Sequence, residues 1–339
     1  MQSDTPISKR KADHISINLT QDVKSGLSAG FENYQFRHEA LPEISLQQVD
    51  TSTSFFGKRL SAPILISSMT GGVSHARKLN EMFACAAEEM QLAMGIGSQR
   101  AAIVHPETRT SFEIRQWAPH ALLFANLGAV QLNYGFGLAE CKAAVEMIEA
   151  DALILHLNSL MEAVQPEGDT DFSALLPKIE AICAKLEVPV IAKEVGWGID
   201  SKTAKRLVDV GVSAIDVAGA GGTSWSEVEA YRLQGAQQAV ARSFKDWGIP
   251  TTICLEELAA ADLGVPIIAS GGLENGIDLA KSLAMGASLG GYARKLLGPA
   301  NESYDSLIET LTNIKTEFQL SMFASGLKNV GEFNTSLFI

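Results

Sequence analysis

The sequence predicts a fold of the α/β class, a (β/α)8 TIM barrel with an N-terminal extension. Two observations lead to this prediction. Eight short apolar runs recur along the 339-residue chain, and segments with helical periodicity separate them. The repeated units together span roughly 250 residues, which is the usual size of such a barrel. The same alternation of strand and helix is compatible with a doubly wound parallel sheet, which is the structural alternative.

The eight predicted strands are nearly continuous in apolar residues. Such runs are typical of strands buried on both faces of a parallel sheet, whereas a strand with one wet face alternates apolar and polar residues. In chain order the predicted strands comprise residues 63–68, 92–97, 122–126, 152–157, 188–193, 213–218, 265–270 and 287–292.

Helical periodicity is clearest in residues 139–150. There Ala139, Ala143 and Ile148 share one side of the predicted helix, while Glu140 lies on another. Three further segments show the same periodicity and end near Gly, Pro or small polar residues, namely 172–186, 202–210 and 277–285.

Two parts of the chain depart from the repeat. Residues 1–62 precede it, and we expect them to form an N-terminal extension that covers the barrel. Residues 63–339 are expected to form the barrel itself, with a helix and tail after Leu297. The segment 219–252 is longer than an ordinary connection and carries Gly, Trp and Ser. Loops of that length are usually functional or disordered.

The composition excludes several classes of function. Hydrophobic residues make up 46% of the chain, and the formal net charge is −12, so the surface as a whole repels nucleic acid and anionic membranes. The N-terminus lacks the apolar core of a signal peptide, and no window approaches the ~18 consecutive apolar residues of a membrane span. The four cysteines lie far apart without metal-ligand spacing, which indicates buried thiols in a reducing compartment. We therefore expect a cytoplasmic protein with no nucleic-acid or membrane partner.

All eight predicted strands end in small, polar or charged residues. In TIM barrels these carboxyl ends and the loops after them meet on one rim and carry the catalytic residues. A single Gly-Gly pair or a lone His is more often structural than functional, but eight such ends together favour a functional site. The side chains concerned include Ser68, Met69, Thr70, Ser98, Gln99, Arg100, Asn126, His156, Asn158, Glu162, Lys193, Thr223, Ala293 and Arg294.

The seventh and eighth strand ends predict a phosphate site. Ser270 ends the seventh strand, Gly271 and Gly272 follow it, and Arg294 follows the eighth. Barrels often bind phosphate with backbone N–H groups at these two loops. Lys193, at the end of the fifth strand, could reach the electron-rich side of a flavin ring. Because the chain has no GxGxxG fingerprint, these residues favour FMN over a dinucleotide bound in the Rossmann manner.

A second ligand region is predicted around the N-terminus. Arg10, Lys11 and His14 concentrate positive charge in an otherwise acidic protein, and Arg100 follows the second strand. By itself this pattern would indicate a solvated basic terminus. Glu162, just past the fourth strand, adds a carboxylate of the kind that binds Mg²⁺ together with substrate phosphates. The combination predicts a magnesium–diphosphate site.

These motifs resemble the type 2 isopentenyl-diphosphate delta-isomerases. The matching segments run in order along most of the chain, and KEVGWGI followed by GGTSW is the most specific combination. The segments are RKADH at 10–14, SSMTGG at 67–72, GIGSQRAA at 95–102, LHLN at 155–158, QPEGD at 165–169, KEVGWGI at 193–199, AGAGGTSW at 218–225, SGG at 270–272 and YAR at 292–294.

The resemblance implies an activity, cofactors and an assembly. The activity is the FMN- and Mg²⁺-dependent interconversion of isopentenyl and dimethylallyl diphosphates in isoprenoid biosynthesis. That reaction needs reduced flavin, commonly supplied by NADPH, although it has no net redox change. The family also tends to form homo-oligomers, tetramers or larger.

The resemblance also assigns residues to roles. It implies that His156 and Asn158 orient the reacting end of the substrate and that Glu162 holds the metal. The implied diphosphate contacts are Arg10, Lys11, Ser98, Gln99 and Arg100. The implied FMN contacts are Ser68, Met69, Thr70, Ser98, Asn126, Lys193, Thr223, Gly271, Gly272, Ala293 and Arg294.

One position departs from the family pattern. Where the family reads HLN-x-L-Q-E, this chain reads HLNSLME, so Met161 replaces a Gln assigned to substrate binding or proton transfer. A thioether is a weak acceptor and cannot donate a hydrogen bond. A positioned acid–base group typically contributes ~10²–10⁴ in rate. Either the reduced flavin moves the protons and the Gln is auxiliary, or Met161 marks a changed substrate or reduced activity. An FMN oxidoreductase on the same barrel and a flavoprotein without turnover are further alternatives.

Overall fold

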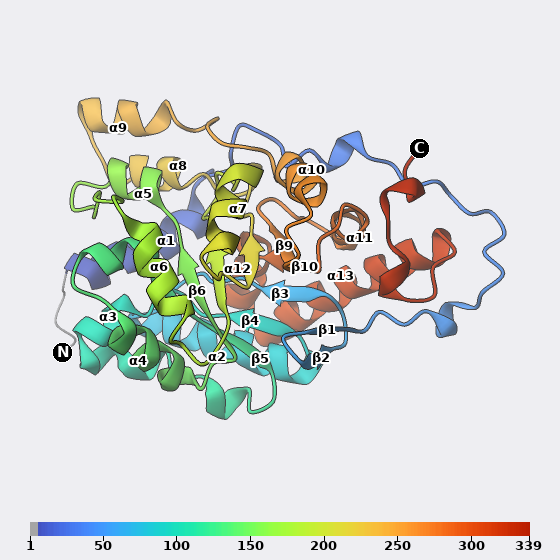
Figure 1. The fold of residues 1–339 in the computed structure, drawn as a ribbon, viewed down its shortest axis with the longest axis horizontal. Coiled ribbons are helices and arrows are strands. Elements are labelled where there is room, and N and C mark those ends of the chain that lie inside the picture. Colours follow the sequence, from blue (N-terminus) through green and yellow to red (C-terminus); the bar gives the residue numbers. More distant parts are fainter. Residues whose placement is uncertain (1–5) are drawn as a thin grey trace.

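A closed barrel of eight parallel strands forms the centre of the molecule (Figure 1). The computed structural model describes residues 6–339. The barrel strands are β3 (Ile64–Ile66), β4 (Ala93–Gly95), β5 (Leu122–Gly128), β6 (Ala152–His156), β7 (Val190–Lys193), β8 (Ala214–Asp216), β9 (Ile267–Ser270) and β10 (Leu289–Tyr292). Pairing of Gly291 with Leu65 joins β10 to β3 and closes the sheet. The (β/α)8 prediction is therefore confirmed, and the doubly wound alternative is wrong, because an open sheet would leave two unpaired edges.

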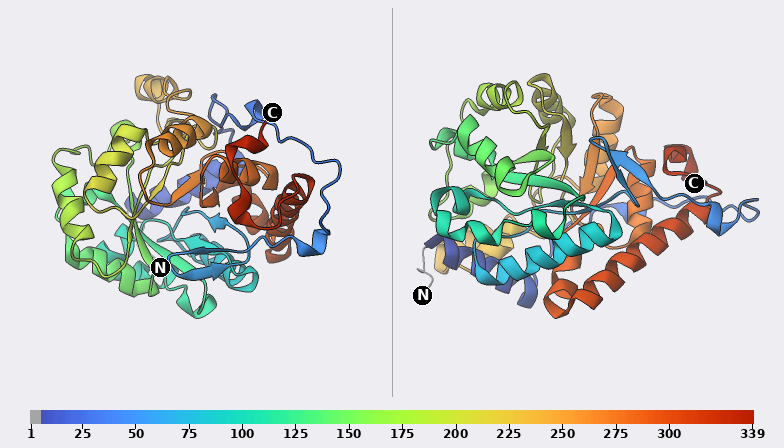
Figure 2. Two further views of the ribbon diagram at one scale, coloured as in Figure 1. Left: turned by 45° about the vertical axis from the view of Figure 1, so that its right-hand side comes forward. Right: turned by 90° about the horizontal axis from the view of Figure 1, so that it is seen from below.

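Helices surround the barrel on its outside (Figure 2). In chain order the helices after β3 are α2 (Ser74–Met90), α3 (Arg100–Val104), α4 (Leu138–Ile148), α5 (Ser159–Val164), α6 (Leu175–Cys183), α7 (Ser201–Asp209), α8 (Trp225–Ala230), α9 (Gly235–Arg242), α10 (Thr251–Ala261), α11 (Gly276–Ala284), α12 (Arg294–Glu302) and α13 (Tyr304–Ala324). The periodicity predictions are confirmed as α4, α6, α7 and α11, with ends shifted by one to three residues. Periodicity does not locate caps: Asp200 accepts from the N–H of Thr203 and starts α7 one residue earlier than predicted.

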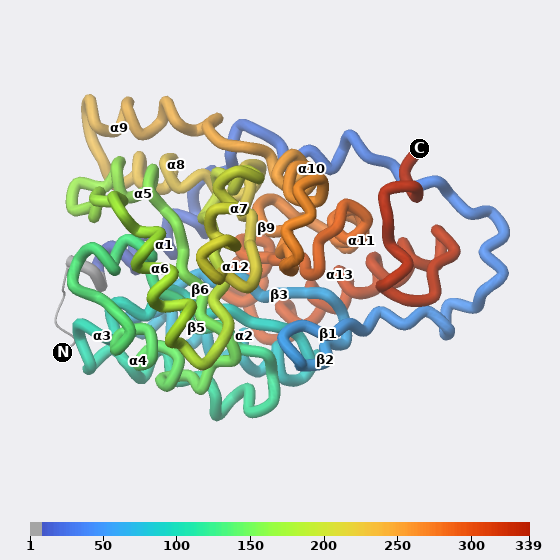
Figure 3. Tube along the Cα trace, in the orientation of Figure 1, coloured from blue at the N-terminus to red at the C-terminus, as the bar shows by residue number. Residues whose placement is uncertain are grey.

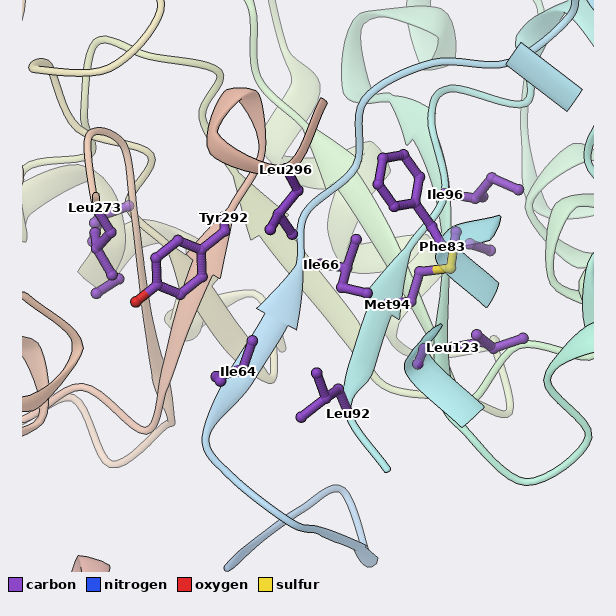
Figure 4. Packing of buried hydrophobic residues seen from close by; sticks show 14 of the residues in the cluster. Ile64, Ile66, Phe83, Leu92, Met94, Ile96, Leu123, Leu273, Tyr292 and Leu296 are labelled. Atoms are coloured by element: carbon purple, nitrogen blue, oxygen red, sulfur yellow. The ribbon is translucent and has the colours of Figure 1, made fainter. Parts of the chain in front are cut away.

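Both faces of the barrel sheet are buried, as the apolar runs predicted. Leu65 belongs to the cluster inside the barrel, whereas Ile64 and Ile66 on either side of it pack outward against the helices. This alternation follows from the two-residue period of a strand. Figure 4 shows the outer cluster, in which Phe83 of α2 and Tyr292 of β10 are fully buried.

The N-terminal segment reaches both ends of the barrel. Helix α1 (Pro6–Thr20) lies at the carboxyl ends of the strands, where it contributes to the cavity described below. The chain then passes along the outside (Figure 3) to the antiparallel pair β1 (Thr53–Phe55) and β2 (Lys58–Leu60). Phe55 and Leu60 are buried in the cluster inside the barrel, so this hairpin closes the end opposite to α1.

The segment 219–252 is not the long loop that its length suggested. It forms α8 and α9 before α10 begins, and Val228 and Leu233 are buried. The tail after Leu297 is mostly helical, as predicted, because α13 buries Leu311 and Phe318. Among the helices of residues 6–339, none is both long enough and apolar enough to cross a membrane.

Candidate active site

The carboxyl ends of the barrel strands and helix α1 line one large cavity. The structure brings together here every residue predicted for the site except Gln99. Those that line the cavity are Arg10, Lys11, Ser68, Met69, Thr70, Ser98, Arg100, Asn126, His156, Asn158, Met161, Glu162, Lys193, Thr223, Gly271, Gly272, Ala293 and Arg294.

Gln99 is a correction to the predicted site. Its side chain is fully buried and points away from the cavity, into the layer between β5 and α4. Nε2 donates to the carbonyl of Ala144 at 2.8 Å, and Oε1 accepts from the N–H of Asn126 at 2.9 Å. Because both polar ends of the amide are engaged, the side chain of Gln99 supports the end of β5 and does not line the cavity.

The loops after β9 and β10 form a cradle of backbone N–H groups. No hydrogen bond within residues 6–339 uses the N–H groups of Gly271, Gly272, Ala293 or Arg294, which we call the backbone cradle. Gly271 has φ +100°, and a Cβ there would stand 2.1 Å from the carbonyl oxygen of Gly219. Ala293 precedes α12, whose N-terminus has no side-chain cap. Unpaired N–H groups at a helix N-terminus favour an anion such as a phosphate group.

Beside the backbone cradle lies a buried charged group. Lys193 Nζ is 3.2 Å from Ser270 Oγ and 3.3 Å from Asp216 Oδ2. Asp216 is fully buried, and its Oδ1 accepts from Ser270 Oγ at 2.5 Å. Sequence reasoning missed Asp216, although a carboxylate within a buried strand is a signal in itself, because a buried charge requires a partner.

These features fit the predicted flavin. The hydroxyls of Ser67 and Ser68 are buried, line the cavity and lack a hydrogen-bond partner within the described residues. Together with the backbone cradle they leave donors for a polar, phosphorylated ligand. The side chain of Lys193, paired with Asp216, lies in the cavity wall and could contact a flavin ring there.

His156 enters the cavity as a neutral imidazole. Burial, and then the charges of Lys193 and Lys11, lower the pKa of His156 to about 4. Its Nδ1 lies 2.8 Å from Asn126 Oδ1. With that oxygen as acceptor, Nδ1 carries the proton and Nε2 presents a lone pair, so His156 is an acceptor and not an acid near neutral pH.

Three basic side chains from α1 and α3 line another part of the cavity wall. We call Arg10, Lys11 and Arg100 the cation group. Arg10 Nη1 donates to Gln165 Oε1 at 2.8 Å, and Lys11 Nζ donates to the carbonyl of Ser98 at 3.0 Å. Burial, and then the charges of Arg10 and Arg100, lower the pKa of Lys11 to about 7. Arg10 and Lys11 donate to neutral oxygens and only Arg100 pairs with a carboxylate, that of Asp169, so the group keeps a positive charge that suits an anion.

His14 does not add to this charge. Its Nε2 lies 2.7 Å from Glu229 Oε1 and its pKa is lowered from the usual value, chiefly by burial. Glu229 is fully buried on α8, where it also pairs with Arg232 at 2.5 Å. The His14–Glu229 contact therefore anchors α1 to α8. Glu229 is another residue that the sequence did not single out.

Glu162 lies next to the cation group and is 7% exposed. Asn158 Nδ2 donates to Glu162 Oε1, and the N–H of Asp169 donates to Oε2, each at 2.8 Å. No cluster of three or more His, Cys, Asp or Glu within residues 6–339 could hold a metal by itself. Mg²⁺ commonly takes one or two carboxylates, several waters and substrate phosphates. A single carboxylate, with the unpartnered oxygen of Asn158 beside it, fits a metal that arrives with its substrate.

The fold and the cavity together define a flavin-binding barrel of the FMN-dependent dehydrogenase type, and that family matches residues 20–116 and 140–339. The soluble mutant of (S)-mandelate dehydrogenase from Pseudomonas putida has the same fold, with a TM-score of 0.70 at 16% identity over 98% of this chain and 96% of its own. A flavocytochrome b2 with sulfite bound gives a TM-score of 0.68 at 17% identity over 96% of this chain and 82% of its own.

Much more similar sequences define the family within this type. The isopentenyl-diphosphate delta-isomerase of Rickettsia bellii (strain RML369-C) is 50% identical over 323 residues, 95% of this chain and 94% of the relative. That of Nostoc sp. (strain PCC 7120) is 49% identical over 329 residues, 96% of this chain and 94% of the relative. The chain belongs to the isopentenyl-diphosphate delta-isomerase family, and the resemblance found in its motifs is confirmed.

Proposed function

We propose that the chain interconverts isopentenyl diphosphate and dimethylallyl diphosphate, with FMN reduced by NADPH and Mg²⁺ on Glu162. One observation carries this proposal. The backbone cradle for a cofactor phosphate and the cation group for a second anion line the same cavity, with Glu162 beside the latter. A site for two phosphorylated ligands, one resident and one exchanged, suits a flavin enzyme that acts on a diphosphate ester.

The cation group and Glu162 would hold the diphosphate. Arg10 and Arg100 present fixed guanidinium charges, and Lys11 supplies an ammonium that gains its proton when an anion enters. Charge-assisted hydrogen bonds of this kind are roughly twice as strong as neutral ones. Holding the diphosphate at one end places the alkene and keeps the leaving group from departing.

The reaction adds a proton to the terminal alkene carbon and removes one from the neighbouring methylene, so positive character develops at the tertiary carbon. Bound reduced flavin supplies an electron-rich ring that stabilises such charge. The chain contributes orientation: His156 is held by Asn126, and Asn158 is held by Glu162. Helix α1, anchored through His14 and Glu229, covers the cavity and limits the access of water.

Met161 supports a second candidate, an isomerase-like enzyme with altered substrate or reduced activity. Its thioether lines the cavity at a position where the motif resemblance implies an amide. A thioether has no proton to donate, so Met161 cannot take part in proton transfer. The contacts of His156 with Asn126, of Asn158 with Glu162 and of Asp169 with Glu162 nevertheless form without it. We therefore favour the isomerase with its usual substrate.

The proposal is tested with the FMN-loaded enzyme under anaerobic conditions. FMN is reduced with NADPH, isopentenyl diphosphate and Mg²⁺ are added in D₂O, and NMR follows dimethylallyl diphosphate and deuterium incorporation. We expect conversion without net flavin oxidation, and none when Mg²⁺ is chelated. Stoichiometric bleaching of oxidised flavin by a substrate would instead identify an oxidoreductase. If the flavin stays intact and no substrate is converted, the chain would be a flavoprotein that binds its ligands without turnover.

We also propose that the chain assembles into a homo-oligomer, a tetramer or larger. Tyr231 and Trp247 are 38% and 61% exposed on the segment that contains α8 and α9. Large exposed aromatic side chains are enriched at protein interfaces. Light scattering of the purified protein tests this directly.

A further inference from the structure

Asp169 joins the cation group to the carboxylate proposed for the metal. Its Oδ2 accepts from Arg100 Nη1 at 2.5 Å and from Gln131 Nε2 at 3.0 Å. Its backbone N–H donates to Glu162 Oε2 at 2.8 Å. One residue on the loop after α5 thus fixes both Arg100 and Glu162, although these belong to different helices.

The Arg100–Asp169 pair is partly removed from water, with side-chain exposures of 29% and 14%. A pair of this kind is screened less than one on the open surface. Asp169 contacts the guanidinium at Nη1 only, and no hydrogen bond within residues 6–339 uses Arg100 Nε or Nη2. Because the guanidinium is a planar fork, holding one edge sets the direction of the other donors. Asp169 therefore orients Arg100 without consuming its capacity to bind a ligand.

The same carboxylate changes which anion the cavity accepts. A ligand that reaches Arg100 also meets the negative charges of Asp169 and Glu162. Free diphosphate is repelled by both, which opposes the attraction of the cation group. A diphosphate that carries a divalent cation reverses this effect, because the cation is attracted by both carboxylates.

We propose that Asp169 is a positioning and specificity-determining residue, which orients Arg100, fixes Glu162 and makes the site select metal-complexed diphosphate over the free anion. This inference rests on the proposed function, since the metal and the diphosphate are the ligands assigned to that site. Asp169 would act on the reaction through Arg100 and Glu162.

The test measures the binding of inorganic pyrophosphate to the FMN-loaded enzyme by calorimetry, with and without Mg²⁺. The ratio of the two dissociation constants gives the coupling between metal and anion. In Asp169→Asn the amide oxygen can still accept from Arg100 while the charge is lost. We expect metal-free binding to tighten, metal-dependent binding to weaken, and the coupling ratio to fall by about tenfold.

Two variants control for structural damage. Asp171→Asn removes an exposed carboxylate two residues further along the same loop, whose Oδ1 contacts only Ser173. It should leave the coupling ratio unchanged, and Asp169→Glu, which restores the charge, should recover most of it. An Asp169→Asn variant that loses affinity equally with and without Mg²⁺ would show a merely structural role and overturn the inference.

The measurement on the wild-type enzyme distinguishes a failure of this inference from a failure of the proposed function. If Mg²⁺ does not increase pyrophosphate affinity in the wild-type enzyme, the metal site itself fails and the inference falls with it. If the wild-type enzyme shows the increase and Asp169→Asn keeps it in full, only the role of Asp169 is wrong.

Discussion

The two regions of the cavity proposed to bind anions are built in different ways. The backbone cradle consists of main-chain N–H groups at the ends of two adjacent strands, so it requires no rotamer choice and no partner side chain. The cation group consists of long side chains from α1 and α3, each held by a residue from another element, such as Gln165 for Arg10. A cradle of main-chain groups suits a resident cofactor, whereas a group of charged side chains suits a ligand that enters and leaves.

The largest effect is expected from a methyl group in the backbone cradle. In Gly271→Ala the new Cβ would meet the carbonyl oxygen of Gly219 at 2.1 Å, at a φ of +100°. Strain of about 2–5 kcal/mol is expected from the overlap and the left-handed backbone. We expect FMN affinity to fall by about hundredfold or more, measured by flavin absorbance of the purified protein and by titration with FMN.

Gly298→Ala is the matched control for that variant. Gly298 lies in α12, and a Cβ there has nothing within 4 Å. We expect full flavin content and a change in stability of no more than about 1 kcal/mol, because Pro299 disfavours helical backbone at the residue before it and offsets the usual gain from replacing Gly. If the Gly271→Ala protein contained as much flavin as this control, the backbone cradle would not be the cofactor site.

Loss of a cation should affect the substrate and spare the cofactor. Arg10→Met removes a charged hydrogen-bond donor worth about 1.5–3 kcal/mol, so kcat/KM should fall by roughly tenfold to hundredfold through KM. FMN content should stay unchanged. Lys9→Met, on the exposed side of the same helix, should change kcat/KM by less than about twofold. If Arg10→Met lost its flavin, the cation group would also be needed for cofactor binding, and the two regions would not have separate roles.

The cation group should also bind protons together with its ligand. Lys11 has a lowered pKa of about 7 in the free protein, so above that pH its amine is mostly neutral. A bound diphosphate favours the ammonium and raises this pKa. Affinity should therefore fall as pH rises above about 7, by up to about tenfold per unit.

Calorimetry of pyrophosphate binding at about pH 8, in two buffers with different ionisation enthalpies, measures this proton uptake. Lys11→Met is the reference, since the protons of the ligand itself contribute equally to both proteins. Equal uptake by the two proteins would remove Lys11 from the anion site.

The smallest effect is expected at Met161. The contacts of His156 with Asn126 and of Asn158 with Glu162 close without any polar group at position 161. Met161→Gln should therefore change kcat/KM by no more than about threefold, well below the ~10²–10⁴ of a positioned acid–base group. Met161→Leu is the apolar control. A gain of a hundredfold in Met161→Gln alone would show that the natural chain is an impaired isomerase.

Much of this protein could be predicted from its sequence alone. The pattern of apolar residues along the chain reflects which residues are buried. Apolar runs and helical periodicity therefore predicted the eight strands, the barrel and its main helices. The residue types at the strand ends predicted a flavin-type phosphate site and a cationic site on one rim, and the residues named for both line the same cavity. Glycines at 271 and 272 could be recognised because their role depends on the backbone itself.

The tertiary structure decided where side chains point and which charges remain free. Gln99 and Arg100 are neighbours in sequence, yet one is buried against α4 and the other faces the cavity. His14 proved to be an anchor of α1 because Glu229 lies 215 residues away in sequence and 2.7 Å away in space. The direction of a side chain and its pKa depend on packing from distant elements, and no local pattern contains that information.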